Sequence, residues 1–181
     1  MRAEYSFWKG LFVLAFLDEL YPHTLQTGDS SHIPNDAPLM NIQNEILYKK
    51  CKLIKKTNLK DFFNLQITKH ENGFYIRWLD EWEIEGYKNP NEYFKSPLVQ
   101  EFFTKVDKKT FYKVLRHIIE CKGRNPLGTP DYIIWNDKEM VFVEVKRKNE
   151  TLKPEQIEWG EFLIKNKIPY KVLRVNPYSL Q

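Results

Sequence analysis

The segment 128–148, with the sequence GTPDYIIWNDKEMVFVEVKRK, constrains the fold of this chain more than any other part of it. Two runs rich in β-branched and aromatic residues, 131–135 and 140–145, flank the polar turn Asn-Asp-Lys-Glu. This arrangement predicts two antiparallel strands joined by a tight turn. Side chains alternate between the two faces of a strand, so Glu144 and Lys146 are expected on one face.

A hairpin that is symmetric about its turn has three expected cross-strand pairs, which are Trp135 with Met140, Ile133 with Phe142, and Asp131 with Glu144. Directly opposed residues have Cβ atoms roughly 5 Å apart, and like charges at that distance repel each other. A divalent cation such as Mg²⁺ or Mn²⁺ relieves this repulsion, because carboxylate oxygens are ligands that it prefers. Lys146 is then placed to hold a phosphate or an attacking water. The alternative is an exposed hairpin with scattered charges.

The residues around this hairpin resemble the PD-(D/E)xK nuclease superfamily and, more narrowly, the VRR-type nuclease domain of the Fanconi-associated nucleases. The resemblance rests on three motifs, which are Gly128-Thr129-Pro130-Asp131, Glu144-Val145-Lys146, and Gln156 with Trp159. It implies an α/β fold with a restriction-endonuclease-like core, a small mixed central sheet and a helical insertion. It also implies that Asp131, Glu144 and the backbone carbonyl of Val145 hold the principal metal ion.

The family completes its site with a glutamine on the next helix and a glutamate near the start of the domain. Gln156 matches the glutamine and shares a helical face with Trp159, although a plain surface glutamine is the alternative. Glu4 precedes an apolar segment, 7–20, and matches the glutamate as a catalytic and metal-binding residue. Its alternative role is to stabilise the N-terminus of a helix.

Length and composition predict one domain over residues 1–181, with about 21–110 as the helical insertion between the first core helix and the hairpin. By resemblance, members with this insertion are expected to be monomers. The apolar segment 7–20 is too short to span a bilayer and predicts a buried helix. Cys51 and Cys121 have no paired-motif spacing, which favours reduced thiols in an intracellular compartment. His117 lies one turn before Cys121, but two soft ligands do not make a zinc site.

Hydrophobic periodicity and punctuating residues predict most of the remaining elements. Helices are expected at about 41–56, from Asn58 to about Ile67, from Pro97 to about Val106, over the apolar stripe 111–119, and from Pro154 to about Ile168. A further helix is expected within 71–91 by analogy with the family. A strand is expected over 170–175.

Positive charge on the chain is compatible with a polyanionic partner, since the net charge is +4 and the pI is about 8.9. Lys49, Lys52 and Lys56 fall close to one line on a helix and are expected to bind DNA phosphates. The other expected DNA-binding residues are Lys113, Arg116, Arg147 and Lys148. The alternative for the lysine line is a solvated helix face.

These residues predict a metal-dependent nuclease that hydrolyses phosphodiester bonds of DNA. By resemblance, its substrate is a 5′ flap or other branched DNA met in repair. A Holliday-junction-type resolvase, a non-catalytic DNA-binding module and a protein-interaction domain are the alternatives. No glycine-rich phosphate loop, HExxH or CxxC motif in the sequence offers a competing chemistry.

Overall fold

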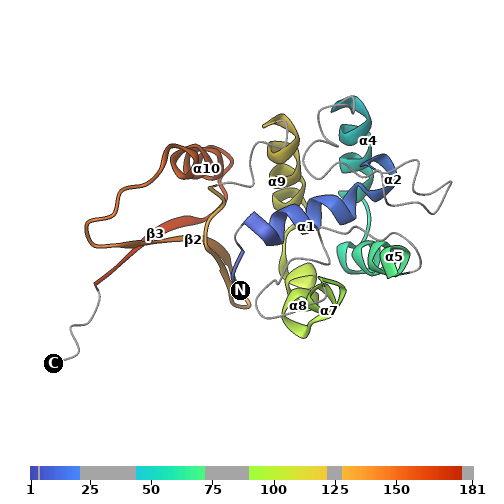
Figure 1. Ribbon diagram of the computed structural model, residues 1–181, viewed down its shortest axis with the longest axis horizontal. Coiled ribbons are helices and arrows are strands. Elements are labelled where there is room, and N and C mark those ends of the chain that lie inside the picture. The colour runs from blue at the N-terminus through green and yellow to red at the C-terminus, as the bar shows by residue number, and fades with distance from the viewer. Residues whose placement is uncertain (4, 21–43, 72–89, 122–127, 177–181) are drawn as a thin grey trace. The chain divides into compact units, whose positions relative to one another are not determined.

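The computed structural model describes residues 1–3, 5–20, 44–71, 90–121 and 128–176. The chain divides into two compact units, one formed by Met1–Trp8 with Asn125–Gln181 and the other by Lys9–Arg124. Figure 1 labels the helices and strands of both units. Most of the helix expected within 71–91 lies outside the described residues.

The first unit is built on a three-stranded sheet in the order β1 (Tyr132–Trp135), β2 (Met140–Arg147), β3 (Tyr170–Val175). β1 pairs with β2 antiparallel, and β3 pairs with β2 parallel. The parallel pair requires a crossover connection, and helix α10 (Pro154–Lys165) supplies it (Figure 1). The expected mixed α/β fold with a small mixed sheet is confirmed.

The hairpin register is also confirmed, because Trp135 pairs with Met140 and Ile133 with Phe142. The first residues of the chain add to the outer edge of β1. The N–H of Ala3 donates to the carbonyl of Asp131 at 2.7 Å, and the N–H of Ile133 donates to the carbonyl of Met1 at 2.8 Å.

The core of the first unit lies on the face of the sheet that carries Phe142. Trp8, in the first turns of helix α1 (Tyr5–Ala15), stacks on Phe142 with ring centroids 6.2 Å apart. From α10, Trp159 and Leu163 are buried, as their shared helical face predicts. Large rings on one face of the central strand therefore exclude water from the surroundings of β2.

The second unit is helical. Besides the rest of α1 it contains α2 (Leu17–Leu20), α4 (Asn44–Ile54), α5 (Leu59–Glu71), α7 (Pro90–Lys95), α8 (Pro97–Lys105) and α9 (Lys108–Glu120). Its core includes stacked rings of Phe63 and Phe103, 4.7 Å apart, with Phe111 edge-on to Phe63 at 5.6 Å. The apolar segment 7–20 is buried as predicted, but it forms two helices interrupted at Phe16 instead of one.

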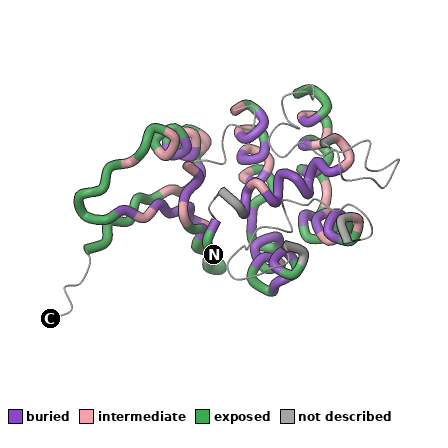
Figure 2. The backbone as a smooth tube through the Cα atoms, viewed as in Figure 1, coloured by how far each residue is buried: buried purple, intermediate pink, exposed green. Residues whose placement is uncertain are grey.

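Local signals account for several helix ends. Pro97 and Pro154 begin α8 and α10 as predicted, at a position where the missing N–H costs no hydrogen bond. Asp107 caps α9 by accepting from the N–H of Thr110 at 2.9 Å. The buried side of α9 is the predicted apolar stripe, and Figure 2 shows buried and less buried residues recurring along the helix. Among the described residues, no helix combines the length and apolarity that a membrane crossing requires.

Candidate active site

Asp131 is fixed at the start of β1 by the loop that precedes it. Gly128 has a φ of +86°, a left-handed conformation that glycine adopts without steric cost. A Cβ at Gly128 would stand 2.6 Å from the backbone carbonyl carbon of Glu155, so the loop packs directly on the start of α10. The Asp131 carboxylate accepts the backbone N–H of Val145 through Oδ2 at 2.6 Å. The sheet itself therefore holds this carboxylate beside β2.

Glu144 lies on the central strand with 1% of its surface exposed. Its Oε1 accepts from Lys146 Nζ at 2.7 Å and from Gln156 Nε2 at 2.5 Å. Its Oε2 is buried and has no hydrogen-bond partner among the residues that the structure describes. Burial raises the pKa of Glu144, and the nearby charge of Asp131 raises it further, against the opposing effect of Lys146.

Lys146 is almost as buried as Glu144, with 4% of its surface exposed. Burial lowers the pKa of an ammonium group, but the ion pair with Glu144 outweighs that effect, so the pKa of Lys146 is raised. Its Nζ also lies 3.5 Å from Oε1 of Glu150. The ammonium group therefore stays charged and is held between two carboxylates.

Gln156 connects α10 to the hairpin. Its side-chain Oε1 accepts from the backbone N–H of Lys153 at 2.9 Å, and its Nε2 donates to Glu144. The first bond fixes which end of the amide faces Glu144, because an amide oxygen only accepts and an amide nitrogen only donates. The prediction that Gln156 points toward a hairpin carboxylate is confirmed in its geometry.

The structure adds contacts that sequence reasoning missed. Glu150, in the loop after β2, accepts the backbone N–H of Arg147 through Oε2 at 3.2 Å. Arg174, on β3, donates through Nη1 to the carbonyl oxygens of Lys148 at 3.3 Å and Glu150 at 2.9 Å. Lys146 lies on β2 and Glu150 in the loop after it, so their spacing of four residues, which signals a contact on a helix, predicts none here. A guanidinium bound to backbone carbonyls leaves no sequence pattern either.

Tyr170 was also missed. It pairs with Phe142 in the parallel register, so both side chains share the face of the sheet that carries Glu144. Its Cε1 lies 2.9 Å from where a Cβ on Gly160 would stand, so the helix admits the ring only because residue 160 is glycine. Burial raises the pKa of Tyr170 to about 12, and the charges of Glu144 and Asp131 add to the shift.

The donor set fits a hard divalent cation. Glu144 Oε2 is a buried carboxylate oxygen without a partner among the described residues, and its strand pairs with β1, which Asp131 directly precedes. The N–H of Val145 points toward Asp131, and in an antiparallel pair the N–H and C=O of one residue point toward the same neighbouring strand. The Val145 carbonyl is therefore directed to the Asp131 side as well. Oxygen donors of these kinds suit Mg²⁺ or Mn²⁺.

The other predicted site residues are distributed as follows. Glu4 lies outside the described residues. Lys49, Lys52 and Lys56 are exposed along and just after α4, and Lys113 is half-buried on α9, all in the second unit. Arg116 is exposed on α9 and forms an ion pair with Glu120 at 2.7 Å. Arg147 and Lys148 are exposed in the first unit, directly after the Glu144 motif.

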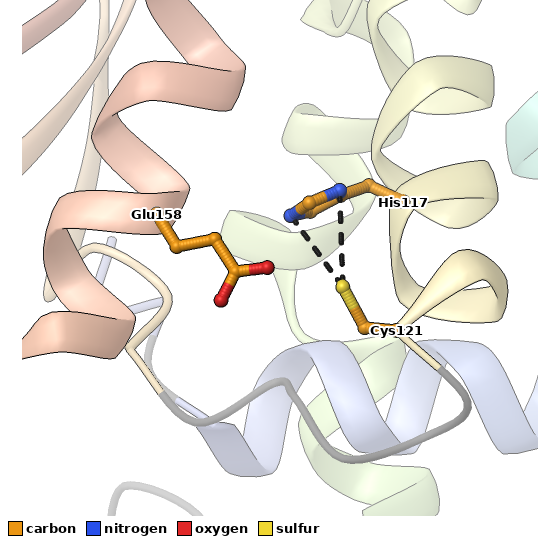
Figure 3. Close-up of side chains that lie close together, drawn as sticks. All are labelled: His117, Cys121 and Glu158. Carbon is orange, nitrogen blue, oxygen red and sulfur yellow. Dashed lines mark hydrogen bonds between the residues drawn. The ribbon is translucent and has the colours of Figure 1, made fainter.

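His117 and Cys121 lie together on one turn at the end of α9. Figure 3 shows the thiol beside the imidazole, with Sγ 3.9 Å from Nδ1 and 3.8 Å from Nε2. Two soft donors from one helix fall short of the four ligands of a structural zinc site.

Comparison with known families agrees with the geometry of the first unit. The model of the VRR-NUC domain matches residues 75–177, which include Asp131, Glu144, Lys146 and Gln156 but not Glu4. No curated protein matches the chain. VRR-NUC is a nuclease domain, so the family suggests a hydrolase that acts on DNA. Since the match covers more than half of the 181 residues, the chain belongs to the VRR-NUC family of nuclease domains.

Proposed function

We propose that the protein is a divalent-metal-dependent deoxyribonuclease that hydrolyses phosphodiester bonds in branched DNA such as a 5′ flap. The observation that carries this proposal is the state of Glu144. One of its oxygens is held by Lys146 and Gln156, and the other is buried without a partner among the described residues. Leaving a buried carboxylate oxygen unsatisfied is costly, and a bound cation removes that cost.

In this proposal Asp131, Glu144 and the carbonyl of Val145 hold Mg²⁺ or Mn²⁺, with Glu4 as a further ligand by resemblance to the family. A bound divalent metal ion supplies Lewis-acid stabilisation of the phosphate and lowers the pKa of bound water. Gln156 keeps Glu144 oriented through its amide. Lys146, charged and held between two carboxylates, orients the attacking water or stabilises negative charge that develops on the phosphate.

A panel of labelled substrates tests the reaction. We expect cleavage of 5′-flap, splayed or four-way DNA with Mg²⁺ or Mn²⁺, no cleavage with EDTA, and none with Asp131→Asn. Preferential, symmetric cutting of the four-way junction would instead identify a resolvase. Binding without cleavage under every metal condition would identify a non-catalytic module and overturn the proposal.

Metal binding can be tested without activity. A ligand that binds only the folded state raises the unfolding temperature. We therefore expect Mg²⁺ or Mn²⁺ to stabilise the parent protein, and neither ion to stabilise Asp131→Asn or Glu144→Gln. Lys109→Gln, an exposed change on α9 in the second unit, is the matched control and should respond like the parent.

We also propose that two groups of basic residues bind DNA phosphates. The second unit contributes Lys49, Lys52, Lys56, Lys113 and Arg116, and the first contributes Arg147 and Lys148. Phosphate contacts carry no base information, so replacing Lys49, Lys52 and Lys56 by glutamine should weaken binding to every DNA sequence. The slope of log affinity against log salt should flatten by roughly 0.9 for each B-DNA phosphate that is no longer neutralised. An unchanged slope would mean that these lysines form only a solvated face.

We further propose that the protein is a monomer, which light scattering tests.

A further inference from the structure

Four side chains form a ladder of alternating rings and cations across the α4–α9 pair. The Arg116 guanidinium lies over the rings of Tyr48, at 5.0 Å, and Tyr112, at 6.0 Å. The Lys55 ammonium also lies over the Tyr112 ring, at 5.0 Å. The order Tyr48, Arg116, Tyr112, Lys55 is therefore continuous, and we call these four residues the ring–cation ladder. All four belong to the second unit.

Helical spacing extends the ladder with further positive charge. Residues four apart are neighbours on a helix surface. Lys52 lies one turn after Tyr48, and Lys108 lies one turn before Tyr112; both are exposed. Glu120 pairs with Arg116 and is a neighbouring acid. The surface around the ladder therefore carries mainly cations.

All four side chains of the ladder are at least partly exposed. Tyr48 and Tyr112 are half-buried, Lys55 is exposed, and the side chain of Arg116 is 44% exposed. The Lys55 ammonium forms no ion pair within the part of the chain that the structure describes. A ring orders a cation without neutralising it, whereas a carboxylate partner would cancel its charge. Lys55 is thus positioned with its charge available.

This combination fits one class of ligand. Proteins bind single-stranded nucleic acid by stacking bases on aromatic rings or guanidinium planes and by placing cations along the backbone. A double helix keeps its base faces stacked inside, so its bases cannot stack on these rings. An alternation of rings and cations therefore suits a single strand better than a duplex. A ladder that serves only to join α4 to α9 is the competing explanation, and it predicts no effect on binding.

We propose that Tyr48, Arg116, Tyr112 and Lys55 bind single-stranded nucleic acid, as found in the unpaired arm of a branched substrate. This inference rests on the proposed function only in taking DNA as the substrate. It adds the strand type that this surface recognises and three residues, Tyr48, Lys55 and Tyr112, that the phosphate-binding set did not include.

Binding is measured on the full chain carrying Asp131→Asn, so that cleavage does not interfere. The probe is a labelled thymidine strand of about 16 nucleotides, compared with a duplex of equal length, by fluorescence anisotropy. Each of Tyr48→Leu and Tyr112→Leu should weaken single-strand binding about tenfold, the effect of removing one base stack. Duplex binding should change less than about twofold. Tyr48→Phe and Tyr112→Phe keep the ring and should bind like the parent.

Lys105→Gln is the matched control, because it removes an exposed charge of the second unit from α8, outside the α4–α9 pair. Single-strand affinity unchanged by both leucine variants would overturn the proposal. So would equal losses for single strand and duplex, or a loss as large in Lys105→Gln. If a leucine variant does not fold, a 5-iodouracil-containing strand is photocrosslinked to the Asp131→Asn protein. Adducts on Tyr48 or Tyr112 support the ladder, and adducts confined to other residues overturn it.

The two proposals fail in different ways. Cleavage of branched DNA by a protein whose leucine variants bind single strands normally would refute the ladder alone. Ladder-dependent single-strand binding by a protein that cuts no DNA with any metal would refute the nuclease proposal alone.

Discussion

The backbone N–H of Val145 donates to the side-chain carboxylate of Asp131, with Oδ2 2.6 Å from the nitrogen. A side chain from the first residue ahead of β1 thus replaces the carbonyl that a longer β1 would have offered. The exchange holds the carboxylate at the position where the hairpin ends. It also means that Asp131 has a structural role besides its proposed role as a metal ligand.

This hydrogen bond separates two substitutions of Asp131. Asp131→Ala leaves the N–H of Val145 without its acceptor and should lower the free energy of unfolding by about 1–3 kcal/mol. Asp131→Asn keeps an acceptor oxygen and should cost less, while both variants should lose cleavage. Urea unfolding of the metal-free proteins and a flap-cleavage assay measure the two effects. Equal destabilisation by Asn and Ala would mean that the Val145 bond contributes little.

Lys146 and Glu144 form a buried ion pair at 2.7 Å, with side chains 5% and 1% exposed. Lys146→Met should therefore destabilise the metal-free protein by about 3 kcal/mol, because it leaves Glu144 buried without its cation. The double variant Glu144→Gln with Lys146→Met should recover much of that loss. At saturating DNA, Lys146→Met alone should reduce turnover at least about a hundredfold with little change in DNA affinity. Parallel losses of affinity and turnover would make Lys146 a backbone anchor instead.

Two glycines near the site should respond differently to alanine. Gly128→Ala combines a left-handed φ of +86° with a contact of 2.6 Å to the Glu155 backbone, so neither strain nor clash is easily relieved. Gly160→Ala meets only the Tyr170 ring, at 2.9 Å, and should cost about 1–3 kcal/mol. Urea unfolding should show the larger loss for Gly128→Ala. The rate of DNA cleavage by Gly128→Ala should also fall, because Asp131 lies only three residues after Gly128. The reverse order of stability would contradict this account of the loop.

The two cysteines should differ in reactivity. Burial raises the pKa of Cys51 to about 12, so at pH 8 only about one thiol in 10,000 is ionised, and the thiolate is the reactive form. Cys121 is half-buried and should label first. A thiol-reactive reagent should modify one cysteine in the native protein and two in urea. Native labelling of the Cys121→Ser variant at a comparable rate would show that Cys51 is accessible.

The sequence was most informative where structure depends on neighbouring residues. The hairpin register follows from the turn at 136–139 and from side-chain alternation, and the structure reproduces it. The orientation of Gln156 toward Glu144 was predictable because helix periodicity places it with Trp159. The interruption at Phe16 was not, because the apolar residues of 7–20 continue on both sides of it. The ring–cation ladder joins helices far apart in the sequence, and no local pattern pairs Tyr48 with Arg116.

Arg174 joins β3 to the loop that carries Glu150. Its guanidinium donates to the carbonyls of Lys148 and Glu150, and the Glu150 carboxylate lies 3.5 Å from Lys146 Nζ. Arg174 is therefore expected to hold Lys146 in place indirectly, through the loop. Both bonds come from Nη1, whose two N–H groups have fixed directions in the guanidinium plane, whereas the donors of a lysine ammonium rotate freely.

Arg174→Lys and Arg174→Gln should each lower turnover about tenfold at saturating DNA, because small displacements of a catalytic group reduce rate. Glu150→Gln should have a similar effect. If Arg174 acts through Glu150, the double variant Arg174→Gln with Glu150→Gln should be no slower than the slower of its two single variants, because the effects of coupled residues do not add. Single-turnover cleavage measures the rates, and the salt dependence of binding serves as the control. Multiplying losses, or a loss of DNA affinity with normal turnover in Arg174→Lys, would show that Arg174 acts separately from Lys146.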